Sequence, residues 1–505
     1  MNKQSDVSIT HRVVMGTGWL VAWRIVSRSL GFVSMLILAQ LLMPADIGIV
    51  ALASSITATI DSLSQLGVRD ALVRLPDEQF ELFNTAFTLQ VMRGVLTGLV
   101  LATGSLFIGG WLHDQRLNGV LLVLAVTAVL AGFENIGTVK LNRALDFKKQ
   151  FVMQAAPRVV GFAVTICLAF VLRNYWALIW GTVFSRLISV IATYVISPHR
   201  PAFGLKGWRY LLHFSFWTWI GSIAVAVWSR ADPFLLGPVL GMAALGIYML
   251  SAEVALLPIT ELLEPAVTAL FPGFAMAQRG GTAPVSIGIS VASTIALGMI
   301  PFAIGLSACS GYLETGLLGP HWKGSQPMIA ILTWLCIFSP YSYVCAAVLS
   351  VQGHVKRVAI TNALAAAVKV AVVLYLRQFH NLPLLAFAAV GIVGLETSIF
   401  IVQLRAAGSA ELRRLAMSGT RALIAAVVTS GALFCLPGTW ETVTMNRVSA
   451  LLLGGLIGVL GFALYGGVQL ILWYGSGCPE GPEGRGFTLL REMTQKICRR
   501  IEYSM

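Results

Sequence analysis

The chain has 505 residues, of which 57% are hydrophobic and only 11% are charged, and its formal net charge is +13. Together with a mean hydropathy of +0.81, this composition excludes a soluble protein with an ordinary polar surface and predicts an integral membrane protein. No platform of basic and aromatic residues accompanies the positive charge, so we do not expect nucleic acid as a partner.

Apolar stretches of about 20 residues, each enough to cross roughly 30 Å of hydrocarbon as a helix, recur along nearly the whole chain. They lack the period-two alternation of barrel strands, so the predicted fold is an all-α polytopic membrane protein with about fourteen transmembrane helices. The predicted centres of these spans, in chain order, are Leu30, Thr57, Gly98, Ala125, Ile166, Val190, Ile220, Leu245, Leu297, Ile337, Leu374, Gly391, Val427 and Val459.

A twelve-residue pattern occurs twice. Residues 42–53 read LMPADIGIVALA and residues 240–251 read LGMAALGIYMLS, each as a small-residue turn between two apolar stretches. Two similar helical halves are typical of transporters that bind substrate between the halves. The shared residues are Leu42, Ala45, Gly48, Ile49 and Leu52, which recur as Leu240, Ala243, Gly246, Ile247 and Leu250.

The repeat predicts four parts of the chain: a six-helix lobe over 1–200, a second over 201–410, two further helices over 411–474, and a basic tail over 475–505. The turns on the N-terminal side of the membrane carry most of the Lys and Arg outside the spans. The positive-inside rule therefore predicts that both termini are cytoplasmic. The first apolar stretch is expected to remain as a span rather than to be cleaved as a signal peptide.

Cations within the predicted spans are the strongest chemical signal, because each costs several kcal/mol if it faces lipid. Arg24 and Arg28 lie one turn apart on one helix face, which Gly31 continues, and a guanidinium offers a planar fork of donors to phosphate oxygens. We therefore predict that an anionic head group is bound by Arg24, Arg28, Arg93 and Lys369. Arg158 and Arg186 complete the set, and Arg158 is placed near the inner border of its span.

Acidic residues within the spans are candidates to neutralise these cations, to line a cavity or to bind a coupling ion. They include Asp61, Glu253 and Glu396, whereas Glu134 is expected nearer the inner face. A structural salt bridge is the alternative for each. The cysteines have neither CxxC spacing nor an extracellular pair, and no GxxxxGK[ST] stretch occurs, so we predict no metal, no other cofactor and no direct use of ATP.

The hairpin LLMPADIGIVALASSI, the following SLSQLGVRDALVR and the cytoplasmic turn LNRALDFKKQ at 141–150 resemble the polysaccharide flippases of the multidrug, oligosaccharidyl-lipid and polysaccharide exporter (MOP) superfamily. The resemblance is to the branch of colanic acid exporters and xanthan-type flippases. In the second half, LSVQGHVKR at 349–357 occupies the place equivalent to LNRALDFKK.

The resemblance implies a transporter of the bacterial inner membrane, not an enzyme. Its substrate would be an undecaprenyl-diphosphate oligosaccharide, moved to the outer leaflet by alternating access for exopolysaccharide export. Basic residues in the cytoplasmic turn, Arg143, Lys148 and Lys149, would attract the anionic carrier. Membrane lipids, a polysaccharide polymerase and export machinery would be its partners.

Two other functions stay open at this point. A drug or cation antiporter of the same superfamily would share the fold, although its cavity should contain few arginines. A membrane polysaccharide polymerase or ligase would share the hydropathy, although such enzymes carry a large periplasmic loop, which this sequence lacks.

Overall fold

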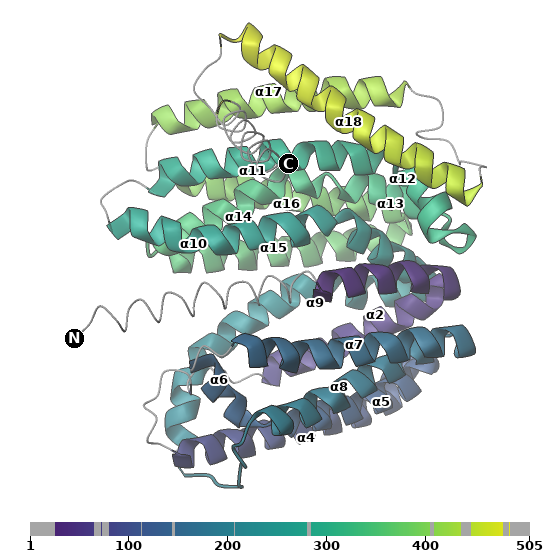
Figure 1. Ribbon diagram of the computed structural model, residues 1–505, viewed down its shortest axis with the longest axis vertical. Coiled ribbons are helices and arrows are strands. Elements are labelled where there is room, and N and C mark those ends of the chain that lie inside the picture. Colours follow the sequence, from purple (N-terminus) through teal and green to yellow (C-terminus); the bar gives the residue numbers. More distant parts are fainter. Residues whose placement is uncertain are drawn as a thin grey trace, which may run out of the picture. The chain divides into compact units, whose positions relative to one another are not determined.

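The computed structural model describes the chain in eight segments, with Leu72 and Gly484 in addition: residues 26–64, 80–112, 114–143, 147–206, 208–279, 284–404, 409–435 and 446–477. Every regular element in these segments is a helix, which confirms the predicted all-α class (Figure 1). Ten helices among the described residues are long and apolar enough to cross a membrane. Each predicted span centre falls within a helix, whereas the number of fourteen spans stays a prediction.

The chain forms two compact units, Met1–Gly246 and Ile247–Met505. The first unit contains the first copy of the repeat and most of α9 (Trp208–Ala255). The division at residues 200 and 410, which follows the sequence repeat, stays a prediction.

The first unit begins, among the described residues, with the short apolar helix Val26–Leu41. Its helices α7 (Phe147–Leu172) and α8 (Trp176–Ile196) lie side by side (Figure 1). Small residues hold them close: a Cβ on Gly161 would lie 3.2 Å from the carbonyl oxygen of Gly181, and a Cβ on Gly181 would lie 3.2 Å from that of Gly161. Further elements of this unit are α2 (Pro44–Ser64), α4 (Phe80–Trp111), α5 (Arg116–Gly132), η1 (Ile136–Thr138) and α6 (Val139–Arg143).

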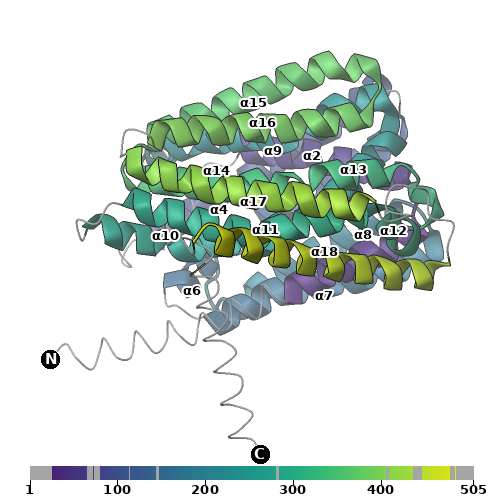
Figure 2. The same ribbon diagram turned by 90° about the horizontal axis from the view of Figure 1, so that it is seen from above.

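In the second unit, α15 and α16 run beside each other, and α17 and α18 lie against α11 (Figure 2). The elements after α9 are η2 (Ile259–Leu263), α10 (Glu264–Arg279), α11 (Pro284–Ala308), α12 (Ser310–Tyr312), η3 (Leu313–Leu318), η4 (Pro320–Trp322), α13 (Ser325–Leu332), α14 (Leu335–Val351), α15 (Val355–Leu376), η5 (Arg377–Phe379), α16 (Leu382–Leu404), α17 (Ser409–Phe434) and α18 (Arg447–Gly475).

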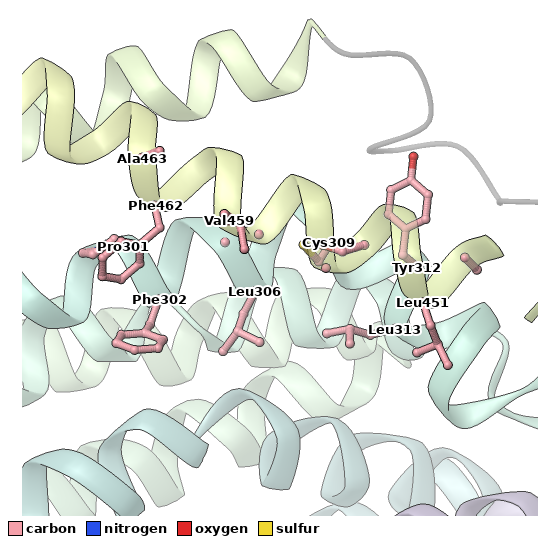
Figure 3. Close-up of a pocket in the computed structure, with 15 residues that line it drawn as sticks. Pro301, Phe302, Leu306, Cys309, Tyr312, Leu313, Leu451, Val459, Phe462 and Ala463 are labelled. Carbon is pink, nitrogen blue, oxygen red and sulfur yellow. Dashed lines mark hydrogen bonds between the residues drawn. The ribbon is translucent and has the colours of Figure 1, made fainter. Parts of the chain in front are cut away.

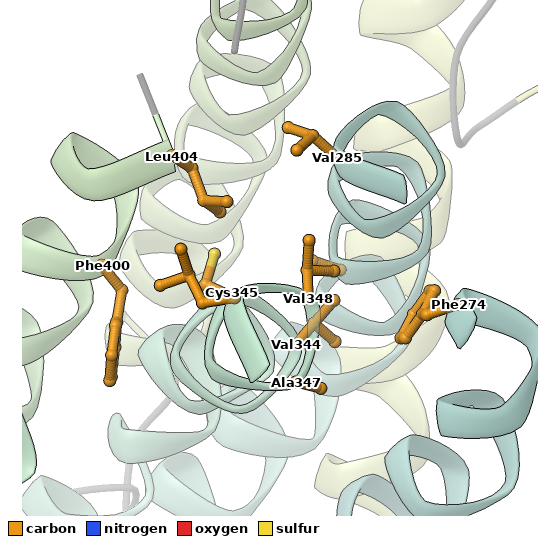
Figure 4. Close-up of a cluster of buried hydrophobic side chains, with 10 residues drawn as sticks. Phe274, Val285, Val344, Cys345, Ala347, Val348, Phe400 and Leu404 are labelled. Carbon is orange, nitrogen blue, oxygen red and sulfur yellow. The ribbon is translucent and has the colours of Figure 1, made fainter. Parts of the chain in front are cut away.

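Helix α14 forms the centre of the second unit. Its Val344, Cys345 and Val348 pack against Phe274 of α10 and Phe400 of α16 (Figure 4). The apolar window of Ser325–Val351 is 72% buried, against 22% for that of α15, although both are hydrophobic enough to span. Helices of similar hydropathy therefore take two different positions: α14 lies in the interior of the unit, whereas most of the surface of α15 stays exposed and is apolar enough to face lipid.

The two copies of the repeat break at equivalent positions. The helix Val26–Leu41 ends just before Met43, and α9 leaves helical geometry at Gly241, with φ 83° and ψ 164°. This conformation strongly favours glycine. The break divides α9 into two helical segments, in agreement with the predicted centres near Ile220 and Leu245.

The two copies also meet in space, at their shared glycine. A Cβ on Gly48 would overlap the carbonyl oxygen of Met242, and a Cβ on Gly246 would overlap that of Pro44. Met242 is the counterpart of Pro44 in the second copy, so the contact is symmetric. The repeat found in the sequence is thus a pair of hairpins whose backbones touch.

Candidate functional site

The predicted cations are distributed over several helices. Arg28 lies exposed on the helix Val26–Leu41, and Lys369 lies half-buried on α15. Arg24 lies outside the described residues. Arg143 ends α6, and Lys148 and Lys149 are exposed in the first turn of α7.

Arg93 of α4 forms an ion pair with Asp61 of α2, with its Nη2 3.2 Å from the carboxylate Oδ1. The arginine side chain is 21% exposed and the aspartate side chain 49%. One turn further along the same two helices, the hydroxyls of Ser64 and Thr97 share a hydrogen bond of 3.2 Å. The Nε of Arg93 is buried without a hydrogen-bond partner in the described part of the chain, so the guanidinium keeps an unused donor.

Arg186 of α8 is also paired. Its Nη1 lies 3.0 Å from Oε1 of Glu134, which also accepts a hydrogen bond from the Ser189 hydroxyl at 3.1 Å. The side-chain amide of Gln90 donates to the backbone oxygen of Glu134 at 2.9 Å. This network joins α4, α5 and α8, so Glu134 has a structural role as the partner of an embedded cation.

Arg158 differs from both. Its guanidinium Nη2 lies 3.6 Å from the position that a Cβ on Gly31 would occupy, and the side chain is exposed. It lies ten residues beyond Lys148, or about 15 Å along the helix at 1.5 Å per residue. The structure therefore places it in the interior of α7, and its expected position near the inner border of the span stays a prediction.

The remaining predicted acids lie in the second unit. Glu253 is exposed near the end of α9, and Glu396 is half-buried on α16. Helix α16 packs against α14, where the Tyr343 hydroxyl donates a hydrogen bond to Glu264 at 3.4 Å. Within the described segments, no three His, Cys, Asp or Glu side chains converge as metal ligands.

An apolar groove of about 630 Å³ runs between α11 and α18 in the second unit (Figure 3). Phe302 and Leu306 line one wall, and Val459 and Phe462 line the other. Glycines of α18 widen it, among them Gly455, which has no atom within 4 Å of the position of its missing Cβ. The groove has room and surface for an apolar chain, and it offers almost no polar contact.

Two buried acids were not selected from the sequence. Asp46 accepts hydrogen bonds from the backbone nitrogens of Met43 at 3.1 Å and Tyr175 at 3.3 Å, and so ties the first hairpin to the start of α8. Glu314 likewise accepts hydrogen bonds from two backbone nitrogens at the start of α13, those of Gly324 and Gln326. An acid in the first turn of a helix is the signal that identifies Asp46 as a cap, whereas Glu314 caps a helix other than its own.

Residues 37–327, more than half of the chain, match the family model described as "Polysaccharide biosynthesis protein". Lipopolysaccharide biosynthesis protein WzxC of Escherichia coli K12 is 22% identical over 339 residues, which cover 65% of this chain and 67% of that protein. Succinoglycan biosynthesis transport protein ExoT of Rhizobium meliloti is 24% identical over 323 residues, covering 63% and 65%. The chain thus matches about two thirds of the length of these relatives.

Solved structures with the same fold come from transporters. Lipid II flippase MurJ in an inward closed conformation superposes with a TM-score of 0.69 at 13% identity, covering 91% of this chain and 99% of that one. An inward-facing multidrug MATE transporter of the MOP superfamily gives a TM-score of 0.57 at 16% identity, covering 79% and 99%. The resemblance drawn from the hairpin and the cytoplasmic turn is confirmed: the chain belongs to the polysaccharide biosynthesis protein family and has the fold of the MOP superfamily.

Proposed function

We propose that this protein moves an undecaprenyl-diphosphate oligosaccharide from the cytoplasmic to the outer leaflet of the bacterial inner membrane by alternating access. The family match supports a role in polysaccharide biosynthesis. ExoT is by name a transport protein and MurJ a flippase, which favours transport over a polymerase or ligase reaction. Cytoplasmic termini, a coupling ion and contact with a polymerase or export machinery belong to the same proposal.

The embedded cations of the first unit are the observation that carries this proposal. A guanidinium in a membrane helix costs several kcal/mol unless an anion or water meets it, and the side chain of Arg158 is exposed. A diphosphate head group satisfies this requirement with charge and with acceptor oxygens. The proposed ligands are Arg24, Arg28, Arg93 and Lys369, and Arg93 would exchange Asp61 for the diphosphate.

Replacing Arg24 and Arg28 together by alanine is expected to reduce polysaccharide export by about tenfold or more, because two charge-assisted contacts to the head group are lost. The measurement is polymer released by cells that carry the variant as their only copy, at matched protein levels. Arg116→Ala is the control, since Arg116 lies outside the proposed ligand set and pairs with Asp114, with its Nη2 2.7 Å from the carboxylate Oδ2. Unimpaired export by the double variant would overturn the role of the pair.

A drug or cation antiporter is the rival function. In proteoliposomes, we expect the wild-type protein to move fluorescently labelled undecaprenyl-diphosphate saccharide and to leave organic cations untransported. The opposite selectivity would favour the antiporter.

The groove between α11 and α18 gives the lipid chain of the substrate an apolar surface. Gly455→Leu is expected to fill part of it and to lower export severalfold. Protein stability should hold or rise slightly, because leucine favours a helix by roughly 0.5–1 kcal/mol over glycine. Leu456→Phe is the matched control, since Leu456 is 66% exposed on the same helix and does not line the groove. Equal export by both variants would exclude the groove from transport.

A further inference from the structure

The cations embedded in the first unit fall into two classes. Arg93 and Arg186 each have a carboxylate partner, at 3.2 Å and 3.0 Å. Arg158 forms no ion pair or hydrogen bond with any residue that the structure describes. Because lipid solvates a guanidinium so poorly, an exposed arginine in the interior of a membrane helix needs an anion or water from outside this set.

The helix Val26–Leu41 and α7 pack alongside each other, and this packing brings the Arg158 guanidinium to Gly31. Leu38 and Leu42 join Ala169 in a buried apolar cluster, and towards the start of both helices Gly31 receives the guanidinium of Arg158. Gly31 precedes Leu38 in the first helix as Arg158 precedes Ala169 in α7, so the two helices run parallel. Helix α7 is also held against α8, by the close contact of Gly161 with Gly181.

Gly31 has no side chain, so the Arg158 guanidinium lies directly against the helix Val26–Leu41, with its Nη2 3.6 Å from the position of the missing Cβ. Arg28 precedes Gly31 by three residues on the same helix, so both are on one face. The helix surface at Gly31 therefore carries one arginine, Arg28, on its own helix and is reached by a second, Arg158, from α7. We call this basic surface at Gly31 the floor of the site. Planar guanidinium groups bind phosphate oxygens in pairs, and two such groups can bind two linked phosphates at once.

We propose that Arg158 is a ligand of the substrate diphosphate, that Arg158 and Arg28 form its two guanidinium arms, and that Gly31 is the floor between them. The inference rests on the proposed function and adds a selectivity to it. A monophosphate fills one arm only, so the site distinguishes a diphosphate carrier from its monophosphate. Arg93, already held by Asp61, is not required for this distinction.

The test measures binding of undecaprenyl diphosphate and undecaprenyl monophosphate to the purified full-length protein in nanodiscs. Arg158→Ala is expected to weaken diphosphate binding by about tenfold or more and monophosphate binding less, so that the ratio of the two affinities falls. Arg158→Lys keeps the charge but loses the planar fork, and should retain part of the affinity while losing much of the selectivity.

Gly31 gives a second test that leaves the charges in place. Gly31→Ala should bind as the wild type does, because its Cβ would make an ordinary contact at 3.6 Å with Arg158. Gly31→Leu covers the floor and should reproduce the loss seen with Arg158→Ala. Each variant is first shown to be folded by its melting temperature. If Arg158→Ala does not fold, Arg158→Lys and Gly31→Leu decide the matter.

The outcomes separate the two proposals. If the wild type binds undecaprenyl diphosphate no better than bulk anionic phospholipid, the proposed function fails and this inference fails with it. If the wild type binds it and the folded Arg158 and Gly31→Leu variants keep both affinity and selectivity, this inference is overturned while the proposed function stands.

Discussion

Alanine at Gly48 or at Gly246 is expected to lower the melting temperature of the purified protein by several degrees and to reduce polysaccharide export. A Cβ at either position would overlap a backbone carbonyl oxygen of the other hairpin, that of Met242 or of Pro44. Backbone cannot rotate away as a side chain can, so the two hairpins must separate. Overpacking of this kind costs about 1–3 kcal/mol or more, and small residues at helix contacts in membranes are what permits close approach.

Gly466→Ala is the matched control for this prediction. Gly466 lies in helix α18 with no atom within 4 Å of its missing Cβ, so alanine there should be neutral or slightly stabilising. Because the contact is symmetric, the two alanine variants should cost similar amounts, and the double variant should cost less than their sum, since either one alone separates the hairpins. Wild-type melting and export in both single variants would mean that the hairpins do not touch at this point.

The repeat also shows how far the sequence alone could lead. Five shared residues predicted two equivalent hairpins, and the breaks at Met43 and Gly241 agree with that. Their contact could not be predicted, because a pattern along the chain does not say which faces meet. Gly48 and Gly246 were visible only as members of the pattern, and the carbonyl oxygens that exclude a side chain there belong to residues with no conspicuous chemistry.

The cations illustrate the same limit. Hydropathy predicted which arginines are embedded, since a charge within an apolar run is visible in one dimension. Whether a cation has a partner depends on neighbours that the fold supplies: Asp61 for Arg93, Glu134 for Arg186 and a bare glycine for Arg158.

Glu314→Ala is expected to destabilise the second unit by roughly 2–5 kcal/mol, because three donors lose one acceptor in a buried place. Oε2 of Glu314 accepts hydrogen bonds from the backbone nitrogen of Gly324 at 3.2 Å, the hydroxyl of Ser325 at 3.1 Å and the backbone nitrogen of Gln326 at 2.6 Å. Glu314 is only 9% exposed. The measurements are the melting temperature and amide hydrogen exchange of the first turn of α13, which should become faster.

The effect should be large because of where the capped helix leads. Gly324, the N-cap of α13, has φ 98° and no side chain to cap the helix, so Glu314 supplies the anion that the helix N-terminus favours. Helix α13 leads into α14 within Ser325–Val351, the span whose apolar window is 72% buried, and fraying at its start exposes residues of the core. Glu314→Gln keeps an acceptor oxygen without the charge and should fall between wild type and Glu314→Ala. If Glu314→Ala melts and exchanges as the wild type does, the carboxylate is not the cap of α13.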